Sequence, residues 1–218
     1  MRLIDLSHTI SDGQVTYPGL PAPVISEHLT FDASHAVYDA GTEFSIGRIE
    51  MVSNTGTYLD TPGHRHRGGH DLSGLQLEKC ALLPALVVEG EVTGATGLAA
   101  FEGLDVAGHA VLVSTGWDLH FGTEAYGDSE HPYLATEAAE WLADQGVALV
   151  GIDSVNIDDT RGGVRAVHTL LLEREIPVVE HLTGLSALPP SGATFTAVPP
   201  KVAGMSTFPV RAFATLPD

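Results

Sequence analysis

Short apolar runs separated by turn residues make up most of the chain. Runs of this length, bounded by Gly, Pro, Asn or Asp, are typical of β-strands. The expected strands are Leu3–Leu6, Ser45–Val52, Leu86–Val88, Ala110–Ser114, Leu149–Ile152, Pro177–Glu180 and Ala193–Val198. All of these runs are far shorter than the roughly 18 residues that span a bilayer, so we expect no membrane segment.

Helical periodicity is clear in two segments. The first, Thr136–Gln145, starts at a threonine that can act as a cap, and a glycine follows it. The second, Ala166–Glu175, is stopped by Pro177, and a weaker helix is expected near Leu98–Glu102. Each strong helix leads directly into a strand, there is more strand than helix, and the first half has long loops. The pattern predicts one α/β domain over residues 1–218 with a mixed sheet.

Composition and charge narrow the class of protein. The chain is 44% hydrophobic, which is enough for a core, and it carries 28 acidic against 10 basic residues. A net charge of −18 argues against nucleic-acid binding, which depends on neutralising phosphates. Cys80, a lone cysteine, forms neither an intramolecular disulfide nor a zinc cluster, and the N-terminus lacks an apolar leader. We therefore expect a cytoplasmic protein that acts on a small molecule and binds no membrane.

The segment NTGTYLDTPGHRHRGGHDL concentrates the residues best suited to chemistry. It contains Asp60, His64, His66 and His70 among several glycines and a proline. Histidine ligates metals and titrates near neutrality, and Gly and Pro turn the backbone so that neighbouring side chains converge. A polar surface loop is the alternative, and it is the better interpretation of His66 and His70 taken individually.

A second region, AVHTLLLEREIPVVEHL, contributes a histidine and a glutamate. His168 shares a helical face with Leu171 and Leu172, so its side chain is expected to point inward. Glu180 ends an apolar strand at a buried-to-exposed edge. A lone histidine on an apolar face is usually a hydrogen-bonded core residue. A His and a Glu at the ends of adjacent elements nevertheless favour a shared site.

Polar residues also follow two other predicted strands. Ser114 and Trp117 come after one of them, and Asp153 and Asp158 after another. Ligand sites in α/β proteins favour the ends of strands. The chain contains no G-x-S-x-G, P-loop, G-x-G-x-x-G or H-E-x-x-H motif.

Taken together, these segments resemble the kynurenine formamidase and cyclase family of metal-dependent hydrolases. The matching blocks run nearly end to end: Ile4–Ser7, Tyr17–Gly19, Asn54–His64, Ser114–Trp117, Gly151–Ser154 and Phe208–Ala212. The block Asn54–His64 aligns with the family signature H-x-G-T-H-x-D-x-P-x-H. The resemblance implies hydrolysis of a formyl amide such as N-formylkynurenine, or of a lactam such as isatin, with zinc or manganese. It also implies a swivelling β/β/α fold and a homodimer or higher homo-oligomer.

The resemblance assigns roles residue by residue. Asp60 matches a metal-binding aspartate, and His168 and Glu180 match a histidine and a glutamate that ligate metal. His64 matches the last signature histidine, beside the reacting centre. Asn54 and Tyr58, however, stand where the family has two further histidine ligands. A binuclear centre is therefore not expected.

One three-ligand site remains from Asp60, His168 and Glu180. It leaves an open position for water, as a catalytic metal needs.

The expected mechanism has His64 as general base and then as acid. Tyr58 or Asn54 would donate a hydrogen bond to the developing oxyanion. Tyr17, Trp117 and Ser114 are candidates for the substrate-binding wall, and core packing is the alternative role for the two aromatic residues.

Two other functions stay open. A metal-free site, with Tyr58 as acid and His64 as base beside Asp60, would suit a cyclase, dehydratase or isomerase. The third function is a non-catalytic small-molecule binding protein. Retention of Asp60, His64, His168 and Glu180 together argues against it, because unpaired polar groups near a core are costly.

Overall fold

A mixed nine-stranded sheet forms the body of the protein in the computed structural model, which describes residues 1–217. The strand order is β1-β13-β11-β5-β7-β9-β10-β4-β12. The strands are β1 Arg2–Asp5, β4 Tyr58–Asp60, β5 Leu83–Glu89, β7 Ala110–Ser114, β9 Leu149–Ile152, β10 Val178–Glu180, β11 Ser191–Thr196, β12 Thr207–Pro209 and β13 Phe213–Leu216. The predicted α/β fold with a mixed sheet and few helices is confirmed.

The middle of the sheet is parallel and both flanks are antiparallel. Strands β5, β7, β9 and β10 run parallel, whereas β4 pairs antiparallel with both β10 and β12. Parallel neighbours need crossover connections, which place helices on a face of the sheet. The antiparallel β10-β4-β12 edge instead joins residues far apart in the chain, and it carries the candidate site.

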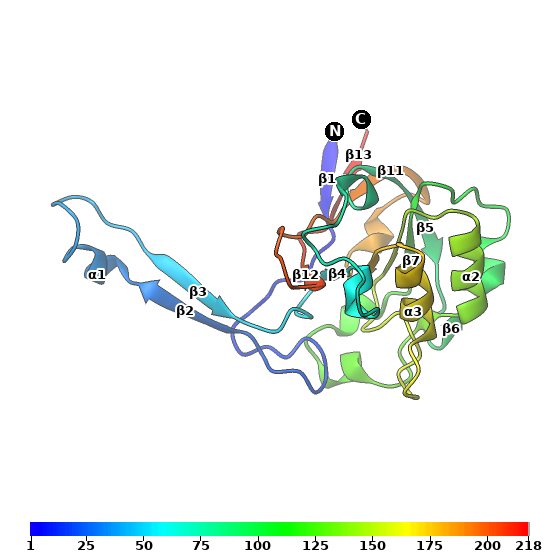
Figure 1. Cartoon of the computed structure of the whole chain (residues 1–218), viewed down its shortest axis with the longest axis horizontal. Helices are drawn as coiled ribbons and strands as arrows, with labels where there is room; N and C mark the ends of the chain where they lie inside the picture. Colours follow the sequence, from blue (N-terminus) through cyan, green and yellow to red (C-terminus); the bar gives the residue numbers. More distant parts are fainter. Residues whose placement is uncertain (218) are drawn as a thin grey trace.

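Helices α2 (Thr136–Asp144) and α3 (Ala166–Glu173) cover one face of the parallel strands (Figure 1). Strand alternation divides the core between the two faces. Val111 and Val113 of β7 pack with the residues of α2 and α3, while Ala110 and Leu112 pack into the cluster on the other face. One local prediction was wrong: Ala135 occupies the N-cap of α2 without a side-chain cap bond, and Thr136 is already helical.

Shorter elements complete the body. They are a two-stranded parallel sheet of β6 Ala95–Thr96 with β8 Tyr133–Leu134, and six 3₁₀ turns: η1 Pro62–His64, η2 Leu77–Lys79, η3 Leu98–Phe101, η4 Trp117–His120, η5 Glu124–Gly127 and η6 Leu185–Ala187. The weaker helix predicted near residues 98–102 is therefore a 3₁₀ turn. Among residues 1–217, no helix has both the length and the apolar character to cross a membrane.

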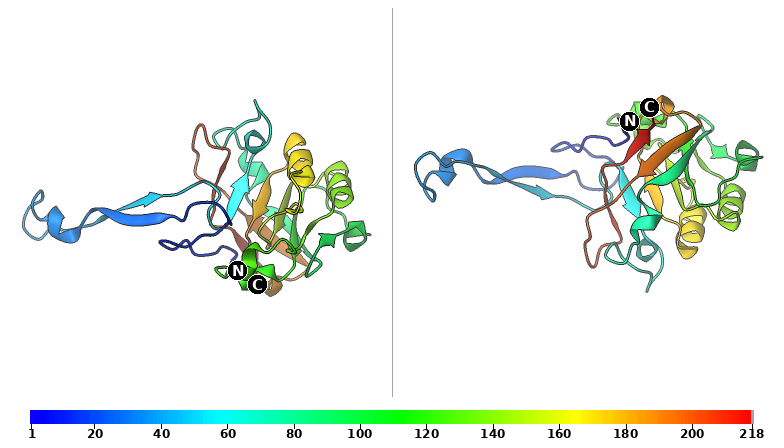
Figure 2. Two further views of the ribbon diagram at one scale, coloured as in Figure 1. Left: turned by 90° about the horizontal axis from the view of Figure 1, so that it is seen from below. Right: turned by 90° about the horizontal axis from the view of Figure 1, so that it is seen from above.

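A long arm projects from the body (Figures 1 and 2). It is an antiparallel ribbon of β2 (Val24–Leu29) and β3 (Ile46–Glu50), with helix α1 (Phe31–Ser34) at its tip. The predicted strand at residues 45–52 is confirmed as β3, but all its residues are exposed. Strand β2 was not predicted because its sequence, VISEHL, has too few consecutive apolar positions.

Cys80 is buried, and desolvation raises the pKa of its thiol to about 11. At pH 8 this leaves a thiolate fraction of roughly one in a thousand, and the thiolate is the reactive form. We predict negligible alkylation of the native protein over an hour with a maleimide at pH 8, measured by mass spectrometry. Full labelling in urea is the control. Rapid labelling of the native protein would contradict the burial of this side chain.

Candidate active site

Strand β4 presents two polar side chains to one side of the sheet. Leu59 enters the core, so Tyr58 and Asp60, its neighbours, face the opposite way. In the sheet register Tyr58 lies opposite Glu180 of β10, and Asp60 lies opposite Thr207 of β12. Directly opposed residues in an antiparallel pair share a face, so the four side chains meet.

The site's central histidine, His168, is held by an aspartate that also caps its helix. The Asp158 carboxylate accepts the backbone N–H groups of Val167 and His168, at 2.7 and 3.1 Å, in the first turn of α3. It also lies 2.6 Å from His168 Nδ1. An Nδ1–H directed at this carboxylate turns Nε2 toward Asp60 Oδ2 at 3.5 Å and Glu180 Oε1 at 3.4 Å. Burial alone lowers the pKa of His168, but Glu180, Asp158 and Asp60 outweigh it and hold that pKa well above its usual value.

Glu180 is fully buried at the end of β10, rather than at a partly exposed edge as predicted. Its Oε1 accepts the backbone N–H of Ile157 at 2.6 Å, and its Oε2 accepts the Tyr58 hydroxyl at 2.6 Å. Burial raises the pKa of such a carboxyl, yet the charge and hydrogen bond of His168 bring it down to about 2. Tyr58 is thereby a partner of Glu180, and burial beside that carboxylate keeps the pKa of its phenol well above 10.

Thr207 links the second histidine to Asp60. Its hydroxyl donates to Asp60 Oδ1 and lies 3.0 Å from His64 Nδ1. Because the hydroxyl hydrogen is directed at the carboxylate, Nδ1–H of His64 is the donor to the threonine oxygen. In this tautomer Nε2 of His64 carries the free lone pair. Sequence reasoning missed Thr207, which lies 143 residues beyond His64 and is brought to it only by the β4-β12 register.

The loop after η1 fixes the position of His64. His66 Nε2 lies 2.9 Å from the Thr169 carbonyl oxygen, and His70 Nε2 lies 2.9 Å from Glu175. Both histidines therefore attach the loop to α3 and its C-terminal end. Within the loop, the Gly63 N–H donates to the His70 carbonyl at 2.9 Å.

Gly69 allows this close approach. A Cβ added there would lie 2.7 Å from the Pro62 carbonyl carbon and 2.8 Å from the Gly63 nitrogen, which are backbone atoms of η1. We predict that Gly69→Ala displaces His64 and lowers stability by about 1–3 kcal/mol, the usual cost of overpacking. Urea unfolding measures the stability change, and turnover is expected to fall with it. Gly162→Ala is the matched control because its Cβ meets no atom within 4 Å. Equal stabilities of the two variants would contradict this role.

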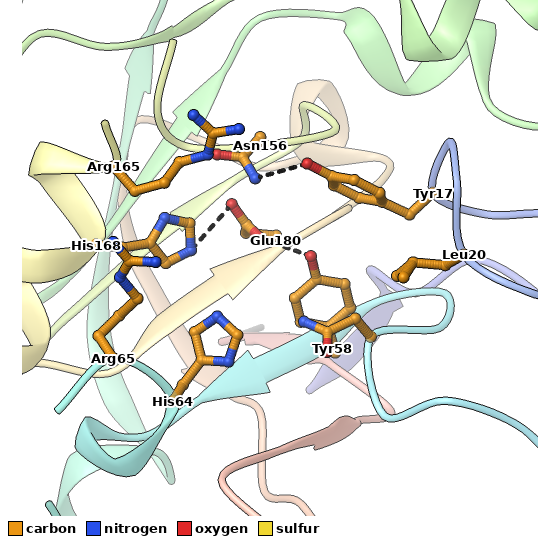
Figure 3. Close-up of a pocket in the computed structure, with 10 residues that line it drawn as sticks. Tyr17, Leu20, Tyr58, His64, Arg65, Asn156, Arg165, His168 and Glu180 are labelled. Atoms are coloured by element: carbon orange, nitrogen blue, oxygen red, sulfur yellow. Dashed lines mark hydrogen bonds and ion pairs between the residues drawn. The ribbon is translucent and has the colours of Figure 1, made fainter. Parts of the chain in front are cut away.

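A cavity of about 260 Å³ opens over these groups. Its lining residues are Tyr17, Leu20, Asn54, Tyr58, His64, Arg65, Asn156, Arg165, His168 and Glu180. Figure 3 shows His64, His168 and the two arginines on one side of the cavity, with Tyr17 and Leu20 on the other. The cavity brings together the predicted Tyr17, Asn54, Tyr58, His64, His168 and Glu180.

Two predicted wall residues lie outside the cavity. Ser114, at the end of β7, lines a separate hollow with Glu89 and Pro190. The indole N–H of Trp117 donates to the Tyr126 carbonyl at 2.9 Å. Neither Ser114 nor Trp117 is therefore among the residues that line the cavity. Leu20, Arg65, Asn156 and Arg165 were not predicted, because no motif marks them.

The residues present fit a divalent cation. Asp60 Oδ2 is buried and has no hydrogen-bond partner, so it is free to ligate. Ligand atoms about 2.1 Å from a tetrahedral ion lie roughly 3.4 Å apart, close to the separations from His168 Nε2 to Asp60 and to Glu180. Within residues 1–217, the set of three whose ligand atoms all lie within 4.8 Å of one another is Asp60, His64 and His168, and Glu180 is not part of it.

An α/β fold in which carboxylate and histidine side chains converge on a cavity is typical of enzymes that bind a metal ion. The chain belongs to the Cyclase family, described as "Putative cyclase", whose model matches residues 4–159. It is 28% identical to the kynurenine formamidase of Salinibacter ruber, over 97% of this chain and 96% of that protein. It is also 28% identical to the kynurenine formamidase of Erythrobacter litoralis, over 92% of this chain and 88% of that one.

A solved structure shares the fold. Isatin hydrolase A from Ralstonia solanacearum superposes with a TM-score of 0.82 at 24% identity, covering 99% of this chain and 92% of that one. The predicted family resemblance is thus confirmed by both family model and relatives.

Proposed function

We propose that the protein is a metal-dependent hydrolase of a non-peptide C–N bond, acting on a formyl amide or a cyclic amide. The observation that carries this proposal is the orphaned Asp60 Oδ2, facing His168 Nε2 beside Glu180 and His64. Two relatives named kynurenine formamidase, which match nearly the whole chain, support the reaction class.

Asp60, His168 and Glu180 would hold the ion, and Asp158 orients His168 from behind. When bound, a zinc or manganese ion supplies Lewis acidity toward the carbonyl and lowers the pKa of water. Two carboxylates with one imidazole suit either metal.

His64 removes a proton from the attacking water through its free Nε2 and returns it to the leaving nitrogen. Thr207 and Asp60 stabilise the imidazolium that forms in between. Since the Tyr58 hydrogen is held by Glu180, Asn54 is the better donor to the developing oxyanion. Tyr58 then acts as a positioning residue for Glu180.

Removal of the metal tests the proposal. We expect one equivalent of zinc or manganese in the purified protein by elemental analysis, and loss of turnover after dialysis against a chelator. Readdition of that metal should restore it. Asp60→Asn is expected to lose both metal and activity, because it removes the orphaned carboxylate. A panel of aryl formamides, lactams and lactones provides the assay; a metal-loaded protein inactive on all of them would refute the hydrolase.

A second candidate is a metal-free cyclase, dehydratase or isomerase. The hydrogen bonds of Glu180 favour it, since Tyr58 and Ile157 each already donate to one of its oxygens. The same chelation experiment separates the two, because this enzyme would keep full activity without metal.

We further propose a cytoplasmic homodimer held by the arm. Two-stranded ribbons are marginally stable alone, and exposed apolar clusters mark interaction surfaces. The arm exposes seven large hydrophobic side chains: Val24, Ile25, Phe31, Val37, Tyr38, Ile46 and Ile49.

The cytoplasmic location is proposed from the single buried cysteine, which suits a reducing compartment. The net charge of −18 opposes nucleic-acid binding.

The cross-strand pair Ile25 and Ile49 provides the test, because both side chains are on one face of the ribbon. Ile49→Glu is expected to turn the dimer into a monomer in size-exclusion chromatography with light scattering. Leu119→Glu, at another exposed apolar position, is the control. A monomeric wild type, or an Ile49→Glu variant that stays dimeric, would refute the arm contact.

A further inference from the structure

Two arginines stand in the cavity wall of a strongly acidic protein. Only 10 of the 218 residues are basic, and the net charge is −18. Arg65 and Arg165 nevertheless both line the one cavity that contains His64 and His168. Arg65 directly follows His64, the last residue of η1. Arg165 is the residue before α3 and lies three positions before His168. Both cations are therefore anchored beside the proposed reacting groups.

Neither arginine is neutralised by the protein. Arg161, Arg174 and Arg211 each pair with an acidic side chain, whereas Arg65 and Arg165 have no carboxylate within ion-pair distance among residues 1–217. Within residues 1–217 Arg67 likewise has no ion pair, but it does not line the cavity, so what distinguishes Arg65 and Arg165 is their position in the cavity wall.

The arginines are oriented but retain free donors. Arg165 Nη1 donates to the carbonyls of Asp159, Gly162 and Val164 at 3.2, 2.8 and 2.9 Å, which fixes the guanidinium. Its Nε and Nη2 have no partner within the described part of the chain. Arg65 Nη2 donates to Thr169 Oγ1 at 3.3 Å, and its other donors are likewise unused. Two planar forks with spare N–H groups are suited to carboxylate recognition.

We infer that the substrate carries a carboxylate near the scissile amide and that Arg65 and Arg165 bind it. This rests on the proposed amide hydrolase. Glu180 contributes a carboxylate to the cavity lining, and Arg65 and Arg165 contribute permanent positive charges to the same lining. The volume of about 260 Å³ lies below the usual range of roughly 300–1,000 Å³ for ligand pockets, so the substrate is small, of the size of one substituted ring.

A matched pair of substrates tests the inference. 2-Formamidobenzoate and 2-formamidobenzamide differ in a carboxylate against a neutral amide of similar shape. The metal-loaded wild type is expected to prefer the anion by at least tenfold in kcat/KM, and added salt should weaken the preference. Arg65→Gln and Arg165→Gln should each bring this ratio down toward one, mainly through a higher KM for the anion.

Arg67→Gln is the control, because Arg67 is in the same loop but does not line the cavity. Thermal unfolding checks that Arg165→Gln keeps its loop intact, because Arg165 holds three backbone carbonyls of that loop. Arg65→Gln tests the same prediction without disturbing these carbonyl contacts. Equal turnover of both compounds by the wild type, or equal losses on both in the arginine variants, would overturn the inference and leave the hydrolase standing.

Ligand binding tests the carboxylate site in the case that neither compound is hydrolysed. Both compounds are also titrated as ligands by thermal shift. If neither is hydrolysed but only the anion stabilises the protein, and Arg65→Gln abolishes that effect, the carboxylate site stands and the hydrolase fails. If neither is hydrolysed and both bind equally or not at all, the carboxylate site is overturned as well.

Discussion

Replacing His64 with alanine is expected to lower kcat by about 10²–10⁴-fold on the best substrate, the usual contribution of a positioned general acid–base. The fold should survive, because the His64 side chain is about one-third exposed and belongs to no apolar cluster. Steady-state kinetics and circular dichroism measure the two effects. The fall should appear equally in kcat and kcat/KM, since the proton transfer occurs only in the transition state.

Two comparisons make this result specific. Arg67→Ala is the matched control in the same loop, because Arg67 is exposed and does not line the cavity. Elemental analysis distinguishes a base from a ligand: a base leaves the metal content at the wild-type level, whereas a fourth ligand lowers it. Full activity of His64→Ala would remove this residue from the mechanism.

Replacing His168 with alanine is expected to destabilise the chelator-treated protein by about 3–5 kcal/mol, the cost of leaving buried charges without their partner. His168 lies against three buried carboxylates, those of Asp60, Asp158 and Glu180. Without its charge they repel one another in a poorly solvated space. Urea unfolding followed by fluorescence gives the change in free energy.

His70→Ala provides the matched control, because His70 pairs with the exposed Glu175 and should contribute less than about 1 kcal/mol. Adding Glu180→Gln to His168→Ala removes one of the unpartnered charges, so the double variant should regain part of the lost stability. A loss below 1 kcal/mol for His168→Ala would show that the carboxylates do not depend on its charge.

Much of the fold could be predicted from periodicity, but the antiparallel edge of the sheet that carries the site could not. The central parallel strands and both long helices have strong apolar patterns, so their positions were predictable. Strands β4 and β12 have three residues each, too few for a pattern, and they form because β10 supplies a ladder partner for β4, and β4 supplies one for β12. The antiparallel edge of the sheet is thus a tertiary effect.

The dependence on tertiary contacts also explains which residues of the site could not be predicted. The inward-facing His168 and the segment containing Asp60 and His64 were predicted from spacing and residue type. Thr207 was not, since its role arises only from its register with Asp60. Ser114 was placed in the site by the rule that ligands bind at strand ends, which holds for parallel sheets. Here the site lies two strands away from β7, where β10 meets the antiparallel β4.

The arm has an evolutionary consequence for the cavity. Leu20 lies just before β2 and Asn54 just after β3, so both ends of the arm supply cavity wall. Asp60, Glu180 and His168 instead come from β4, β10 and α3, so part of the wall is built on a different unit from the proposed metal ligands. Insertions or substitutions near the root of the arm can therefore reshape substrate preference while the proton-transfer groups keep their geometry. Such a division lets a lineage acquire new substrates without rebuilding its catalytic centre.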